Sequence, residues 1–115
     1  MTEQEIQSTL EATGIPCAYF QFEENTAQPA PFLCWYLPER NDFFADGVNY
    51  AAIATLVVEL YTDERDSARQ AAVEAALTAA ELGWRRDETF IGSEALWMTT
   101  YTTEVYLHEP EQSKV

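Results

Sequence analysis

Basic residues are scarce in this sequence, and their scarcity excludes several kinds of partner. Six Lys and Arg stand against twenty Asp and Glu, which gives a formal net charge of -14. Recognition of nucleic-acid phosphates requires clustered basic side chains, and the only adjacent pair is Arg85 and Arg86. We therefore expect neither specific nucleic-acid binding nor binding to an anionic membrane surface.

Histidine and glycine are also scarce, and this argues against catalysis. The single histidine, His108, opens the segment HEPEQSKV at the C-terminus, where we expect a flexible tail over residues 108–115. A catalytic base must be held rigidly, so a site built on His108 is not supported. The four glycines are too widely spaced for a phosphate-binding loop. We expect no catalytic residues, no cofactor and no enzymatic activity.

A metal site is not predicted either. Asp42, Asp46 and Gly47 resemble the start of a calcium-binding loop, but the pattern fails at two of its ligand positions. Phe44 stands where an oxygen ligand is needed, and Ile53 stands where the loop requires a glutamate. We interpret Asp42 and Asp46 as turn-forming residues.

Long hydrophobic runs are absent. The longest, Leu56–Val58 with the alanines before it, is far shorter than the ~20 residues of a membrane-spanning helix. Residues 1–13 lack the basic start and apolar run of a secretory signal, so we expect the protein to stay in the cell that makes it. In that reducing compartment, Cys17 and Cys34 are expected to be small buried residues rather than a disulfide.

What is present predicts one folded domain. A chain of 115 residues with 47% hydrophobic residues can form a single core, which we assign to residues 1–107. Turn residues and hydrophobic periodicity predict an α+β fold with a mostly antiparallel sheet of about five strands. A short N-terminal helix and one longer alanine-rich helix complete it. The expected elements are a helix from Thr2 to Gly14, strands over 15–22 and 31–37 joined as a hairpin, a loop or hairpin excursion over 38–49, a strand over 50–62, a helix over 66–82, and strands over 84–91 and 96–107.

Two of these elements have distinct periods. Residues 50–62 alternate as a long strand packed on a core, and we expect this strand to be central. The helix over 66–82 should cover one face of the sheet through Val73, Leu77 and Ala80. We expect Gly83 to end that helix in the left-handed conformation.

The aromatic content indicates a contact surface. Fifteen aromatic residues (three Trp, six Tyr and six Phe) exceed what one small core easily hides. Phe43 and Phe44 lie between Asp42 and Asp46 in a polar loop, so these four residues, together with Trp35, are our candidates for subunit or partner contact. Two alternatives stay open: one Phe ring plugs the sheet edge, and Trp35 and Tyr36 lie on opposite faces of their strand, with one of them in the core.

The succession of these segments resembles a known family. From about Ile15 to Leu107, about four fifths of the chain, it is similar to the tail terminator-like minor structural proteins of long-tailed bacteriophages and prophages of Gram-positive hosts. The resemblance rests on the segments AYFQFEE, APFLCWYLP, NDFFADGVNY, TLVVELYTDERD, ELGW and ETFIGSEALWMTTYTTEVYL. No single invariant signature carries it.

The resemblance implies a structural protein without catalysis. Members of that family form a ring, typically a hexamer, which closes the head-proximal end of the tail tube and joins it to head-completion proteins. The implied location is the virion tail, and the host cytoplasm during assembly. An acidic ring around the path of DNA would repel the duplex and let it slide. The alternative is an acidic soluble adaptor or inhibitor of the DNA-mimic type, which binds a basic protein partner.

Overall fold

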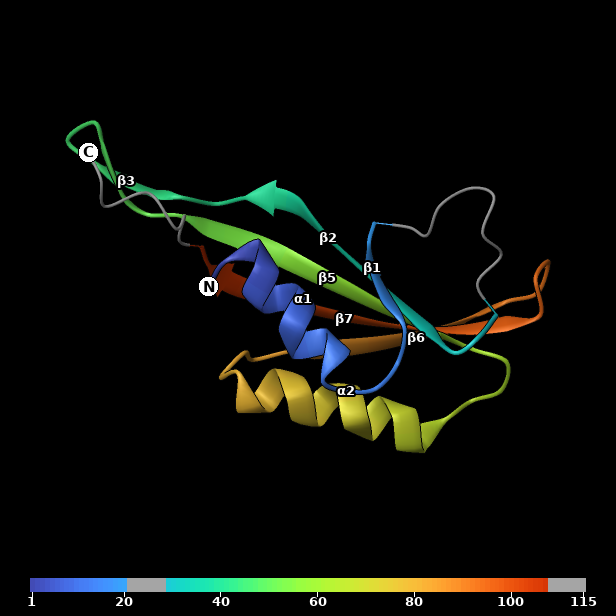
Figure 1. Ribbon diagram of the computed structural model, residues 1–115. Helices are drawn as coiled ribbons and strands as arrows, with labels where there is room; N and C mark the ends of the chain where they lie inside the picture. Colours follow the sequence, from blue (N-terminus) through green and yellow to red (C-terminus); the bar gives the residue numbers. More distant parts are fainter. Residues whose placement is uncertain (21–28, 108–115) are drawn as a thin grey trace.

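The computed structural model describes residues 1–20 and 29–107, which form a five-stranded sheet flanked by two helices (Figure 1). The sheet order is β1-β2-β5-β7-β6, and β3 and β4 form a separate two-stranded ribbon. The α+β class and the mostly antiparallel sheet are confirmed. The elements are α1 (Glu3–Glu11), β1 (Cys17–Tyr19), β2 (Phe32–Arg40), β3 (Phe43–Ala45), β4 (Val48–Ala51), β5 (Ile53–Thr62), α2 (Ser67–Ala79), β6 (Arg85–Ile91) and β7 (Leu96–Tyr106).

The first two strands correct one prediction. They were expected as a hairpin, but β1 pairs with β2 in parallel, with Cys17 opposite Leu33 and Tyr19 opposite Trp35. Parallel strands need a connection of about a dozen residues, and residues 20–31 supply that length. β1 and β2 therefore do not form the expected hairpin. The expected strand positions 21 and 22 lie outside the described residues.

Strand β5 is the central strand, as predicted. It pairs antiparallel with β2 on one side and β7 on the other. Every second side chain is buried, which matches the period of two read from the sequence. Residues 50 and 51, expected as its first positions, belong instead to β4. The buried set is Ala54, Leu56, Val58, Leu60 and Thr62.

Both helices pack on the same face of the sheet. From α1, Ile6 and Leu10 are buried, and from α2, Val73 and Leu77 are buried. Their partners are alternate residues of β2, β5 and β7, which the strand register places on one face. The prediction that α2 covers the sheet through Val73 and Leu77 is confirmed, while Ala80 is only half-buried.

The end of α2 corrects a second detail. The helix stops at Ala79, and the residue in the left-handed conformation is Glu81, with φ 62°, rather than Gly83. The Glu81 N–H donates to the Thr78 carbonyl at 2.9 Å and the Leu82 N–H to the Leu77 carbonyl at 3.0 Å. This pair of bonds satisfies the last carbonyls of the helix. The chain therefore turns before it reaches the glycine.

Candidate functional site

Strands β3 and β4 form an arm that continues β2 and β5 beyond the end of the sheet (Figure 1). We call residues Phe43–Ala51 the aromatic arm. Its turn is made by Asp46 and Gly47, which both have positive φ, at 52° and 76°. Two successive left-handed residues suit a tight hairpin between twisted strands. Of the two predictions for residues 38–49, the hairpin excursion is therefore the one observed.

The large side chains of the aromatic arm are exposed. The exposed fractions are 57% for Phe43, 60% for Phe44, 50% for Val48 and 64% for Tyr50. The rings of Phe43 and Tyr50 contact each other at a tilt of 49°, with ring centroids 6.4 Å apart. Because neither phenylalanine enters the core, the alternative in which one ring plugs the sheet edge does not describe this structure. A cluster of this kind on a small acidic domain is typical of a protein-binding surface.

Asp42 fixes the base of the aromatic arm. Its carboxylate accepts hydrogen bonds from Arg40 Nε at 2.9 Å, Arg40 Nη2 at 2.7 Å, Asn49 Nδ2 at 2.9 Å and the Ile53 backbone N–H at 3.0 Å. These bonds, that of Arg40 first, lower the pKa of Asp42 below its ordinary value. Asp42 thus joins both strands of the arm to the start of β5.

We expect Asp42→Asn to loosen the arm without unfolding the domain. The amide keeps the size of the carboxylate but loses its charge and half of its acceptor capacity. Amide hydrogen exchange at Ile53 and Asn49 should quicken, while exchange in β5 and β7 stays slow. In the natural protein the pKa of Asp42 is lower in the folded state than in the unfolded state. The stability that its hydrogen bonds contribute is therefore present above the ordinary pKa of an aspartate and is lost as the pH falls through the folded pKa. Unchanged amide exchange at Ile53 in the variant would show that Asp42 does not hold the base of the arm in place.

The other two predicted contact residues lie in different environments. Asp46 is exposed at the tip of the arm. Trp35 is only 2% exposed, and its indole N–H donates to Gln7 Oε1 at 2.6 Å. Trp35 faces the helices while Tyr36, next to it, faces the opposite side, which is the second alternative stated above. We therefore leave Trp35 out of the candidate surface, and the contact roles of Asp42, Phe43, Phe44 and Asp46 stay predictions.

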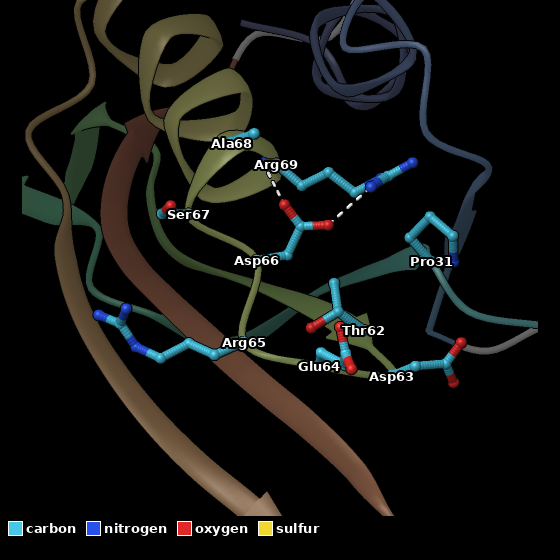
Figure 2. A pocket seen from close by; sticks show the side chains of 9 residues that line it. All are labelled: Pro31, Thr62, Asp63, Glu64, Arg65, Asp66, Ser67, Ala68 and Arg69. Carbon is cyan, nitrogen blue, oxygen red and sulfur yellow. Dashed lines mark hydrogen bonds and ion pairs between the residues drawn. The ribbon is translucent and has the colours of Figure 1, made fainter.

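A separate hollow of about 660 Å³ lies where β5 leads into α2 (Figure 2). Asp66 accepts the backbone N–H of Arg69 at 3.0 Å and its guanidinium at 2.6 Å, and these bonds lower the pKa of Asp66. Arg65 points away from Asp66 and pairs with Glu88 at 3.1 Å. Asp66 and Arg69 thus cap α2, and Arg65 ties the segment before α2 to β6. This arrangement stabilises the start of α2.

The two cysteines lie on opposite faces of the sheet. Cys17 is opposite Leu33, whose neighbour Cys34 points to the other side. Both are free, and burial raises the pKa of the Cys17 thiol to about 12 and of the Cys34 thiol to about 11. A thiol with a raised pKa is a poor nucleophile. Among residues 1–20 and 29–107, no group of three His, Cys, Asp or Glu side chains could hold a metal ion. None of the helices in these ranges is long and apolar enough to cross a membrane.

Comparison of the sequence with models of known protein families and with curated proteins gave no match. The candidate surface therefore rests on geometry, exposure and charge. The resemblance to phage tail proteins stays a prediction.

Proposed function

We propose that this protein is a non-catalytic structural protein of the tail terminator type, from a phage or prophage, which forms a ring at the head-proximal end of the tail tube. The observation that carries the proposal is the aromatic arm. Its four large apolar side chains are at least half exposed, while every buried side-chain polar atom of the described residues has a hydrogen-bond partner. A domain that satisfies its own core and still presents such an arm is suited to binding another protein.

The charge of the protein supports the same role. A ring around the path of DNA must not bind the duplex, and a chain with a net charge of -14 repels phosphate. Contacts between copies then have to use surfaces with few charges. The aromatic arm is such a surface, because Asp46 is the only ionisable acid or base within its nine residues apart from the Tyr50 phenol.

An acidic adaptor or inhibitor of the DNA-mimic type is the second candidate. Among the described residues, four arginines are engaged in ion pairs with carboxylates of the same chain. With twenty Asp and Glu against six Lys and Arg in the sequence, carboxylates remain in large excess over cations. Such a surface would bind a basic partner with steep dependence on salt. A DNA mimic would not need the aromatic arm for self-association, whereas a ring protein would, and this difference separates the two candidates.

We expect the purified protein to be largely monomeric at low ionic strength and to assemble as salt is added. Six copies in a ring would bring together six times the -14 charge of one chain, and this repulsion opposes closure until it is screened. Sedimentation velocity at about 20 mM and about 500 mM NaCl measures the change, since the Debye length falls severalfold over that range. Electron microscopy of the heavier species shows whether it is a closed ring.

The outcomes are distinct. A salt-induced ring supports the terminator proposal, whereas a protein that stays monomeric at both salt concentrations and binds a basic partner only at low salt supports the DNA mimic. A ring already complete at low salt, with no response to added salt, would keep the terminator proposal and show that buried contacts outweigh the repulsion.

A further inference from the structure

The sheet has a second face, opposite the helices, that no described helix or strand covers. We call the half of this face furthest from the aromatic arm the distal face. It is rich in large apolar side chains, namely Phe32, Tyr36, Val57, Tyr61 and Met98. All five are half-buried. They pack against neighbours of the same face, as in the stacked rings of Phe32 and Tyr61, whose centroids are 4.8 Å apart.

The distal face carries two carboxylates among the described residues. Glu59 accepts hydrogen bonds from Tyr36 Oη at 2.9 Å and Tyr61 Oη at 2.7 Å. Asp87 of β6 lies opposite Thr100 on the same face and is exposed. The opposite half of the same face, near the arm, is lined instead by Glu39, Glu104 and Arg85 around a hollow of about 750 Å³. On a chain with a net charge of -14, the distal face and the aromatic arm are thus two surfaces rich in large apolar side chains on which copies can meet once salt screens their carboxylates from one another.

These two surfaces lie at opposite ends of an elongated molecule. The arm leaves the sheet at Arg40 and Ile53, whereas Tyr61 and Met98 lie at the other ends of β5 and its neighbour. Eight residues of strand separate Ile53 from Tyr61, about 26 Å, while the arm is only four or five residues long, about 15 Å. The arm of a chain therefore cannot fold back onto the Tyr61 end of its own distal face.

We propose that the aromatic arm of one copy lies on the distal face of a second copy, in a head-to-tail contact that repeats from chain to chain. This inference rests on the proposed function and specifies how its ring is held together. Contact between two different surfaces of the same chain generates a closed ring or an open filament, whereas contact of a surface with itself stops at a dimer. The apolar arm supplies the anchors, and the distal face supplies an aromatic platform flanked by polar strand residues.

A single contact of this kind is small. Three aromatic side chains of about 200 Å² each, roughly three-fifths exposed, offer at most about 350 Å², so both partners together bury at most about 700 Å². This is less than the ~1,000 Å² expected of a stable pairwise interface. Closure into a ring doubles the area buried per copy, so assembly should be cooperative and should depend on protein concentration.

Two variants of the full-length protein test the contact from its two sides. Phe43→Ser with Phe44→Ser removes the arm anchors, and Met98→Glu places a charge in the distal face. Ala75→Glu, at an exposed position of α2 on the helix side, is the control for added charge. We measure association by sedimentation at the salt concentration that assembles the natural protein. Association should be at least roughly 30-fold weaker for the first two variants and unchanged for the control. Circular dichroism melts establish that each variant is folded.

A mixture of the two deficient variants is the decisive measurement. Each retains one intact surface, so an equimolar mixture at about 1 mM, a concentration that populates even a weak pairwise contact, should form a one-to-one dimer and nothing larger. In this dimer the intact arm of Met98→Glu lies on the intact face of the Phe43, Phe44 variant. If Met98→Glu does not fold, Thr100→Glu, at a half-buried position of the same face, takes its place.

Failure of the inference and failure of the proposed function give different results. If the Phe43, Phe44 variant assembles like the natural protein, or if the mixture stays monomeric even at about 1 mM, the head-to-tail contact is wrong and the ring must use other surfaces. If the natural protein itself never assembles up to about 1 mM at high salt, both the ring and this contact are overturned, since that concentration exceeds the Kd of even weak complexes.

Discussion

Replacement of Leu77 by Asp is expected to unfold the protein at ordinary temperatures. Leu77 is 1% exposed and packs in the core between α2 and the sheet. The substitution removes a buried apolar side chain and places an unpaired carboxylate there, each of which costs several kcal/mol. Their combined cost of about 5 kcal/mol or more is comparable to the whole stability of a small domain. The melting transition by circular dichroism should therefore be lost or shifted down by more than about 20 °C.

Ala75→Asp is the matched control for this prediction. Ala75 lies two residues earlier on the same helix but is exposed, so the same charge is added without burial. We expect a change within about 0.5 to 1 kcal/mol, since the lower helix propensity of Asp is the main effect. Equal melting temperatures for Leu77→Asp and the natural protein would contradict the packing of α2 described above.

The main elements could be predicted from the sequence because their apolar residues repeat with clear periods. In β5, the alternation of Leu56, Val58 and Leu60 with polar or half-exposed neighbours identifies a strand with one buried face. In α2, Val73 and Leu77 have helical spacing, and the alanines around them have high helix propensity. Both patterns are local, so no knowledge of the partner strands was needed.

Features that depend on distant partners could not be predicted. The parallel pairing of Cys17–Tyr19 with β2 is set by where the sheet edge is available. Gln70 is a similar case, because a polar residue at a helical position is normally exposed. It is only 3% exposed here, since its amide donates to Thr99 at 3.0 Å and to Glu88 at 2.9 Å. Only the assembled sheet supplies those two acceptors.

The candidate surface was predicted in part, for a reason that concerns local chemistry. Asp46 and Gly47 form a turn dipeptide that identifies the tip of a hairpin, and two adjacent phenylalanines beside it cannot both be buried easily. The sequence does not show that Asp42 holds the arm in place, because its hydrogen-bond donors come from segments before, within and after the hairpin. The distal face was also missed, because Tyr61 and Met98 come together only through the pairing of β5 with β7.

The second large expected effect is a loss of stability on replacement of Trp35, which lies on the buried face of β2. Trp35→Ala should destabilise the domain by about 3 to 5 kcal/mol, the range for truncating a buried aromatic side chain. The Trp35 ring is 2% exposed, contacts Tyr19 edge-on at 4.9 Å, and donates its N–H to Gln7 of α1. Its loss removes core volume and the polar link between β2 and α1 together. Urea unfolding followed by circular dichroism gives the free energy of unfolding.

Tyr36→Ala is the control at the next position of the same strand, with its side chain on the opposite face. Tyr36 is half-buried, contacts Phe20 edge-on at 5.8 Å, and donates its hydroxyl to Glu59 at the edge of the distal face. We expect a smaller loss, about 1 to 2 kcal/mol, because no cavity forms inside the core. If the distal face receives the arm of another copy, Tyr36→Ala should reduce the free energy of association by more than it reduces the free energy of unfolding. Trp35→Ala should reduce association only in proportion to the fraction of chains that it unfolds. The reverse order of the two stabilities would mean that the helices cover the other face of β2.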